Sequence, residues 1–105
     1  MTDQADFAIG QIVIHRLFGY RGVIFEVDPS FNLSEEWYET MARSRPPKDA
    51  PWYQVLVDNA AHTTYVAQQN LRPSDNLDPI NHPELDQLFE RFDNGHYVPR
   101  RGRVQ

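Results

Sequence analysis

Two blocks of alternating apolar and polar residues dominate the pattern of this chain. They span residues 7–29 and 51–73, and each consists of two short apolar runs joined by a turn. Alternation with a period of two is typical of strands that bury one face. The pattern therefore predicts four strands in two hairpins.

In the first block, the β-branched run of residues 12–14 continues through His15 and Arg16 to a turn at Gly19. Residues 21–28 alternate and predict the second strand, which Pro29 ends. Gly19 suits the positive φ of a tight connection, and Gly22 is expected to mark a bulge.

In the second block, residues 52–58 alternate most clearly and predict the third strand, and turn residues follow up to His62. Residues 63–67 are β-branched and aromatic, which favours a returning fourth strand. Leu71 is expected to point inward, and Pro73 prevents the ladder from continuing.

The 21 residues between the blocks, 30–50, form a long connection, and such connections tend to be functional or to hold their own structure. A short helix is expected there, with Ser34 as N-cap and Trp37 and Met41 one turn apart. This segment is either a lid over one opening of the fold or a loop that grips a ligand.

Beyond Pro73 a polar linker precedes the run ELDQLFERF, whose apolar residues follow a helical period and predict an amphipathic helix that stops at Asn94-Gly95. The tail from residue 95 is expected to be mobile. The apolar stripe packs either on the chain's own sheet or on a partner. In the second case the partner-binding residues are Leu88, Phe89 and Phe92, with Arg100, Arg101 and Arg103 of the tail.

These elements predict a mostly β fold: a small SH3-like barrel with a helical loop insertion and a short C-terminal helix. With 105 residues and 12.3 kDa, one domain over 1–105 is expected, with the barrel core at 7–73 and the linker, helix and basic tail at 74–105. The high aromatic content also makes self-association into a homo-oligomer a fair expectation.

Composition narrows the classes of function. The chain has no cysteine, which excludes disulfides, thiolate zinc sites and thiol nucleophiles. No apolar run approaches the ~20 residues that a membrane helix needs. The N-terminal residues lack the basic and apolar parts of a signal peptide, so a cytoplasmic location is expected.

Charge is unevenly distributed. Residues 1–93 carry seven basic and fifteen acidic side chains, a net charge of −8, whereas the tail arginines carry +3. An acidic body repels a nucleic-acid backbone on average, which disfavours strong non-specific DNA binding. Only a local basic patch could overcome this repulsion.

Catalytic and metal-binding patterns are weak. Glu26 and Asp28 share one strand face, but a solvated face explains them better than paired acid and base catalysis. The histidines lack the spacing of metal ligands, and no nucleophile or phosphate-loop motif is present. We expect no enzyme activity, no cofactor and no metal site.

A candidate nucleic-acid-binding group surrounds the first hairpin, where arginines lie beside aromatic residues and could contact phosphate or stack on a base. It comprises His15, Arg16, Tyr20, Arg21 and Arg72, with Phe18 nearby. In the alternative interpretation, Phe18 and Tyr20 fill the barrel mouth, and Arg16 and Arg21 pair with nearby acids. The residues alone favour this alternative.

A combination of short motifs resembles the HspQ heat-shock proteins, which share the YccV-like domain. The combination is His15 followed by the RGVI of residues 21–24, then Trp52-Tyr53, and then the YVAQQNL of residues 65–71. The resemblance covers about residues 7–73. It implies a non-enzymatic stress-response regulator to which two roles are attributed: binding hemimethylated DNA, and acting on the Lon protease as a specificity-enhancing factor.

Overall fold

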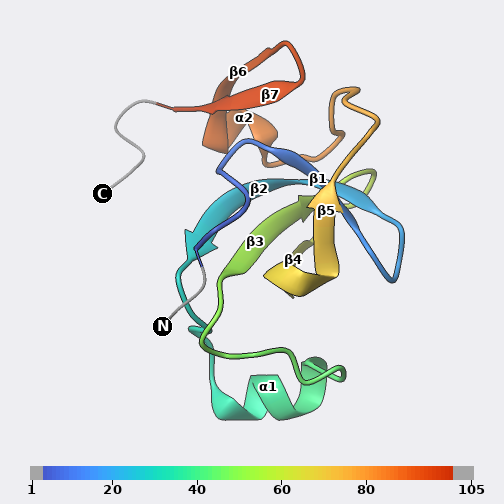
Figure 1. Cartoon of the computed structure of the whole chain (residues 1–105). Coiled ribbons are helices and arrows are strands. Elements are labelled where there is room, and N and C mark those ends of the chain that lie inside the picture. The colour runs from blue at the N-terminus through green and yellow to red at the C-terminus, as the bar shows by residue number, and fades with distance from the viewer. Residues whose placement is uncertain (1–3, 101–105) are drawn as a thin grey trace.

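The computed structural model describes residues 4–100 and is mostly β (Figure 1). In chain order its elements are β1 (Ile12–His15), β2 (Arg21–Asp28), α1 (Glu35–Met41), β3 (Trp52–Val57), β4 (Thr63–Ala67), the 3₁₀ turn η1 (Gln68–Asn70), β5 (Leu71–Pro73), α2 (Leu85–Leu88), β6 (Phe89–Asp93) and β7 (His96–Pro99). All four strands expected from the two blocks are confirmed.

The five strands of the first two blocks form one antiparallel sheet in the order β4-β3-β2-β1-β5, and β6 pairs only with β7. The strands β4 and β5 are the two edges of the larger sheet, and no strand pairing between them closes it. The mostly β class is thus established, whereas closure into an SH3-like barrel is not confirmed.

The first hairpin contains both glycine positions singled out above. Gly19 lies in the turn with φ +75°, as expected. The bulge expected at Gly22 lies instead at Phe25, where the register between β2 and β3 shifts between Ile24 and Glu26. Gly22 has a different role: a Cβ there would lie 2.4 Å from Val55 Cγ1, so β2 approaches β3 too closely for any side chain.

The core lies on both faces of the sheet. Paired residues share a face, so Ile24, Val55 and Leu71 meet with other residues on one face, while Ile12 and Leu56 meet on the opposite one. Leu71 is 1% exposed, which confirms its predicted inward position. Burial on both faces explains why so few of these strand residues are polar.

The C-terminal segment departs from the sequence prediction. The helix spans only Leu85–Leu88, and the chain then continues into β6. Asn94 and Gly95, expected to stop a helix, have φ values of +54° and +85° and form the two-residue turn between β6 and β7. Asn-Gly is a strong signal for such a hairpin, and the helical period masked it. The tail expected to be mobile is a strand at His96–Pro99, and residues 101–105 lie outside the described part.

This C-terminal hairpin covers one face of the large sheet (Figure 1). Phe89 and Tyr97 pack against Ile12 and Leu56 there. Tyr97 N donates to Gly10 O at 2.9 Å, and a Cβ on Gly10, whose φ is +94°, would lie 2.0 Å from Tyr97 O. Gly10 is therefore the position at which the hairpin reaches the backbone of the sheet.

The expected helix in the long connection is confirmed as α1. Ser34 Oγ accepts a hydrogen bond from Trp37 N at 3.0 Å, as an N-cap does. Tyr38 of α1 packs with Trp52 and Tyr65 of the sheet, and its hydroxyl donates to Pro46 O at 2.7 Å. The helix is thereby fixed over the ends of β3 and β4.

Within residues 4–100, no helix has both the length and the apolar character that crossing a membrane requires.

Candidate binding surfaces

A large hollow of the described molecule runs along the free edge of β4 and has a volume of about 610 Å³. All five residues of β4 form its floor. The β1–β2 turn and the segment of α1 form its walls, and in Figure 1 they lie on different sides of β4. We call this hollow the seam groove. Its wall residues include Leu17, Phe18, Tyr20, Leu33, Trp37, Met41 and Arg43.

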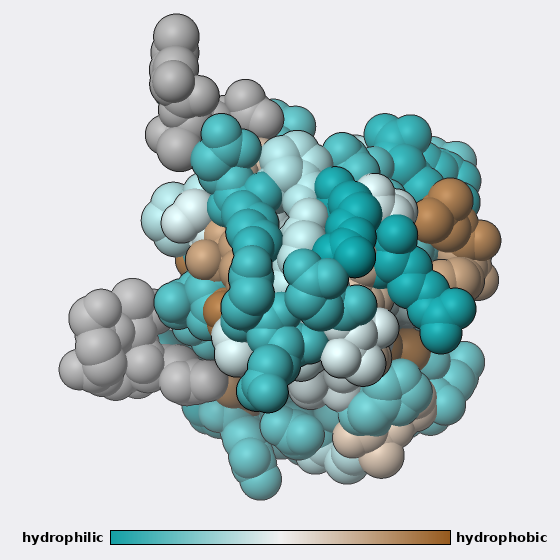
Figure 2. All heavy atoms as spheres, turned by 90° about the horizontal axis from the view of Figure 1, so that it is seen from below, coloured by the Kyte–Doolittle hydropathy of each residue, from teal (hydrophilic) through white to brown (hydrophobic). Residues whose placement is uncertain are grey.

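Exposed apolar side chains concentrate in this groove. Among the described residues, six large hydrophobic side chains are exposed, and four of them, Leu17, Phe18, Leu33 and Met41, line the seam groove. Figure 2 views the molecule from the α1 end and shows a mostly hydrophilic surface whose largest hydrophobic cluster lies at the right. Such a concentration of apolar surface is typical of a binding site.

Packing behind the groove makes its aromatic wall rigid. The rings of Trp52 and Tyr65 stack with their centroids 5.2 Å apart, and Trp37 meets Tyr65 edge-on. Tyr65 Oη donates to Asp28 Oδ2 at 2.6 Å and accepts from Asn32 N at 3.0 Å. Burial and the bond to Asp28 raise the pKa of Tyr65 far above its usual value, so the hydroxyl stays protonated.

His15 organises the β1–β2 turn. Its Nδ1 accepts hydrogen bonds from Leu17 N and Phe18 N, both at 3.1 Å, and its ring stacks on Phe18 with centroids 4.6 Å apart. The ring is buried, and burial lowers the pKa of His15. A neutral ring whose Nδ1 is occupied by the backbone is a structural group of the turn, and it presents Phe18, 77% exposed, at the tip.

Tyr20 lies at the end of the β1–β2 turn, beside His15. Its hydroxyl shares a hydrogen bond of 2.8 Å with Thr64 Oγ1 on β4, and burial raises the pKa of Tyr20. The residue is half-buried rather than free to stack. Phe18 is the better-exposed aromatic ring of the hairpin.

Arg21 is occupied by structural contacts. It forms an ion pair with Asp58 at 3.0 Å, and its guanidinium also donates to the carbonyls of Asn76 and Asp78, both at 2.9 Å. Its side chain is only 14% exposed. This matches the alternative in which Arg21 pairs with an acid, and leaves little of the guanidinium for a phosphate.

Arg72 lies on the edge strand β5, and Arg16 of the β1–β2 turn reaches the same strand. Arg16 Nε donates to Leu71 O at 3.0 Å, and no acidic partner of Arg16 lies among residues 4–100. Arg72 is opposite Ile14 in the ladder and has only a distant pair with Asp75, at 3.9 Å. Both guanidinium groups are thus the accessible cations of the predicted nucleic-acid-binding set.

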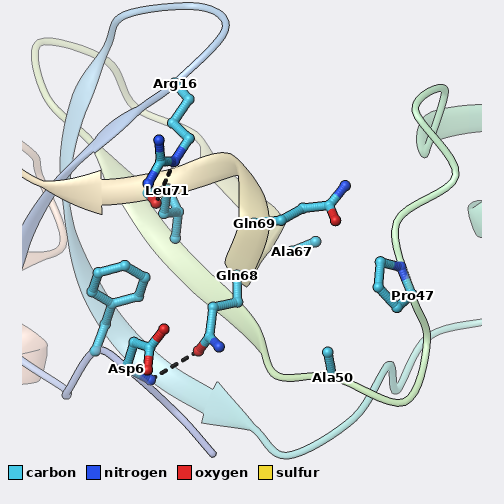
Figure 3. A pocket seen from close by; sticks show the side chains of 9 residues that line it. Asp6, Arg16, Pro47, Ala50, Ala67, Gln68, Gln69 and Leu71 are labelled. Carbon is cyan, nitrogen blue, oxygen red and sulfur yellow. Dashed lines mark hydrogen bonds between the residues drawn. The ribbon is translucent and has the colours of Figure 1, made fainter. Parts of the chain in front are cut away.

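Arg16 also borders a smaller hollow, of about 220 Å³, beside η1 (Figure 3). Asp6 N donates to Gln68 Oε1 there at 2.8 Å, which fixes the N-terminal segment against η1. Pro47 and Ala50 close the far side. This hollow is smaller and more polar than the seam groove.

The predicted partner-binding stripe is divided by the fold. Phe89 is 4% exposed and belongs to the core, whereas Leu88 packs at its margin and Phe92 is 36% exposed. Arg100 donates from Nε to Asp86 O at 2.5 Å. Arg101 and Arg103 lie outside the described residues.

The sequence did not single out the groove as a site. Phe18 was noted as a candidate, but Leu17 and Arg43 were not, and Met41 was noted only as a residue of the helix, because the groove is formed by separate segments that only the fold brings together. One signal was present: a tryptophan in an unusually long strand connection. In residues 4–100 no group of three or more potential ligands is arranged to hold a metal ion.

The fold and these surfaces define a small, mostly β module with an apolar groove at a sheet edge. Residues 5–96 match the family model described as "Hemimethylated DNA-binding protein YccV like", and the chain belongs to this YccV-like family. The match extends beyond the 7–73 of the resemblance and includes most of the C-terminal hairpin.

Several curated relatives are similar to this chain over 95 residues. F-box only protein 21 of Pongo abelii and of Homo sapiens are each 34% identical, and that of Mus musculus is 33% identical, over 89% of this chain. The chain spans only 15% of the length of these relatives. The shared region is therefore one module within much longer proteins.

Proposed function

We propose that this chain is a non-enzymatic binding module that recognises hemimethylated DNA. The observation that carries the proposal is membership of a family described by that activity. In this proposal the five-stranded sheet is an SH3-like barrel that stays open between β4 and the β1–β2 turn.

The DNA contacts in this proposal come from the β1–β2 turn and from the edge strand β5. Arg16 and Arg72 supply phosphate contacts, because both guanidinium groups are accessible. Phe18 or Tyr20 supplies the stacking surface, and His15 fixes the turn that presents them. Arg21 supports this surface through Asp58 and is not assigned a phosphate.

The test is fluorescence anisotropy with one labelled duplex in hemimethylated, fully methylated and unmethylated forms at ~0.15 M salt, where non-specific binding is weak. The proposal expects tighter binding of the hemimethylated form. Equal affinity for all three forms, or no binding, would refute it.

Arginine variants then locate the contact. Arg16→Ala and Arg72→Ala should each weaken binding and reduce the salt slope by about one. Arg91→Ala is the matched control, because Arg91 is exposed and pairs only with the adjacent Glu90. A salt slope unchanged in both variants would remove this edge from the DNA site.

A second candidate function is regulation of the Lon protease through protein contacts. The net charge of −5, with the described cations Arg21, Arg45, Lys48 and Arg91 already paired with acids, favours a protein partner over a phosphate backbone. The test is the rate at which purified Lon degrades a defined substrate with and without the chain. Truncation after Arg100 tests the tail arginines and leaves β7 intact. A cut at residue 94 would remove β7 as well.

A further inference from the structure

The two edges of the sheet differ in how they are protected from pairing with another strand. The edge strand β5 has three residues, two of which are Arg72 and Pro73. Short length, charge and proline are the features that natural proteins use to prevent edge pairing. The edge strand β4, Thr63–Ala67 with the sequence TTYVA, has none of them. Its sequence therefore leaves this edge available for pairing.

The backbone of β4 also offers free hydrogen-bonding groups. Val57 N donates to His62 O, and Gln68 N donates to Pro51 O, so these two residue pairs are hydrogen-bonded pairs of the β3–β4 ladder. Such pairs alternate along antiparallel strands. By this alternation Thr63, Tyr65 and Ala67 direct their N–H and C=O groups away from β3. Thr63 is exposed, whereas Tyr65 and Ala67 are only 9% and 3% exposed, so the accessible groups lie at the Thr63 end of the strand. Within residues 4–100 no other strand pairs with them.

The surroundings of this edge fit an extended peptide. β4 is the floor of the seam groove, whose walls carry the exposed Leu17, Phe18 and Met41. A strand laid along five residues is about 17 Å long. Its backbone would pair with β4, and its alternate side chains would enter the apolar groove, which is the recognition mode of strand addition.

Charge further limits the occupant. Arg43 is the one charged side chain in the lining of the groove, apart from the titratable His15, and no acidic residue lines it. Arg43 has no ion-pair partner among the described residues. A carboxylate on the bound segment would complement it, whereas the tail arginines Arg101 and Arg103 would not.

A second copy of the chain fits this edge poorly. Symmetric pairing would bring two β4 strands together about a two-fold axis. Each β4 is the floor of a groove walled by the β1–β2 turn and the α1 segment, so symmetric pairing would also have to bring both sets of walls together. A separate extended segment has no such obstruction.

We propose that the seam groove docks an extended peptide segment of a partner protein, apolar at alternate positions and carrying a carboxylate that faces Arg43, by strand addition to β4. This surface overlaps the proposed DNA surface, because His15, Phe18 and Tyr20 line the groove, whereas Arg16 and Arg72 lie outside it.

The test uses the full chain and a display library of nine-residue peptides randomised at every position. Selection should enrich peptides with apolar residues at positions i, i+2 and i+4 and an Asp or Glu. Arg43→Glu should weaken the enriched peptides at least tenfold, and the matched control Arg91→Glu, on the remote β6, should leave their affinity within twofold. Absence of enrichment, or enriched peptides without alternation, would overturn the proposal.

The backbone contact is tested separately. Thr63→Pro removes one outward N–H at the exposed first residue of β4, and N-methylation of alternate amides of the peptide removes its partners without altering the protein. Thr63→Pro should weaken binding at least tenfold. Methylation of the peptide amides that face β4 should do the same, and methylation of the amides that face away should not. Equal effects of both methylation sets would overturn strand addition.

Two measurements distinguish the other occupants. Arg16→Ala and Arg72→Ala, at residues outside the groove, should leave the affinity of the enriched peptides within twofold. A tenfold loss in both variants would place the peptide on the DNA surface and overturn the proposal. Concentration-dependent hydrogen-exchange protection of Thr63, Tyr65 and Ala67 in the chain alone would assign the edge to a second copy and also overturn it.

Discussion

At the scale of single residues, two arginines of the same turn have different roles because their tertiary contacts differ. Arg16 and Arg21 lie at the two ends of the same turn and were assigned to one site by sequence. The structure gives Arg21 an acidic partner and three backbone carbonyls, whereas Arg16 donates to one carbonyl and stays exposed. Sequence identified both as candidates and could not separate a structural arginine from an accessible one.

The first prediction follows from this difference. Arg21→Ala leaves Asp58 without its cation and frees the carbonyls of residues 76–79, so it should lower the free energy of unfolding by about 3 kcal/mol. Arg91→Ala, at an exposed pair, should change it by less than about 0.5 kcal/mol. Urea denaturation measures both. Similar small losses would show that the Arg21 network is not stabilising.

The second prediction concerns the pH dependence of His15. Burial lowers the pKa of His15 below its ordinary value of 6.5, so in acid the unfolded chain binds this proton more readily than the folded one. Stability is therefore complete above about pH 6.5 and decreases as the pH falls below it. Protonation would also break the bonds from Leu17 N and Phe18 N.

His15→Gln, which keeps an acceptor and does not titrate, should lose less unfolding free energy than the wild type between pH 7.5 and 5.5. Urea denaturation at both pH values gives the comparison, and other titrating groups cancel in the difference. An equal loss in both proteins would mean that His15 does not sense pH.

At the scale of elements, strand pairing sets requirements that local propensity does not show. Gly19 and Gly22 are close neighbours in one hairpin, yet only Gly22 faces another backbone. A Cβ at Gly22 would lie 2.5 Å from Leu56 O, whereas nothing lies within 4 Å of one at Gly19, whose φ is +75°. Gly22 is therefore required by the packing of β2 against β3, and Gly19 by its backbone conformation.

The third prediction uses this pair. Gly22→Ala forces β2 and β3 apart and should cost about 3 kcal/mol or more of unfolding free energy, as overpacking at a rigid backbone does. Gly19→Ala should cost only about 1 kcal/mol, the penalty of a left-handed conformation. Thermal and urea unfolding of both variants test the order. A larger cost at Gly19 would contradict the close approach at Gly22.

The C-terminal elements show where local prediction failed. The spacing of Leu85, Leu88, Phe89 and Phe92 suits a helix, but only its first turn is helical, because from Phe89 the chain gains a strand partner in β7 and a core position on the sheet. The Asn94-Gly95 dipeptide carries the hairpin signal, and its left-handed pair of residues is compatible with both a helix end and a turn. Tertiary packing decided between them.

At the scale of the whole molecule, the C-terminal hairpin and the main sheet share one core. Phe89 and Tyr97 of the hairpin pack with Ile12, Val23 and Leu56 of the sheet. We therefore expect residues 4–100 to unfold in one transition, although the hairpin forms a separate two-stranded sheet.

The fourth prediction tests this coupling. Phe89→Ala should lower the free energy of unfolding by about 3–5 kcal/mol, and Phe92→Ala, at a half-exposed position, by less. Both tryptophans lie outside the hairpin, so their fluorescence reports on α1 and β3. It should shift together with far-UV circular dichroism. An unchanged fluorescence midpoint in Phe89→Ala would show that the hairpin unfolds independently.

By itself the sequence determined the strands of the two blocks, the helix capped by Ser34 and the buried Leu71, because period, turn residues and caps act over a few neighbouring positions. It also determined the family, since short motifs keep their order and spacing. Only the tertiary structure decided the C-terminal hairpin, the structural role of Arg21 and the seam groove. These depend on contacts between segments distant in sequence, which local patterns do not encode.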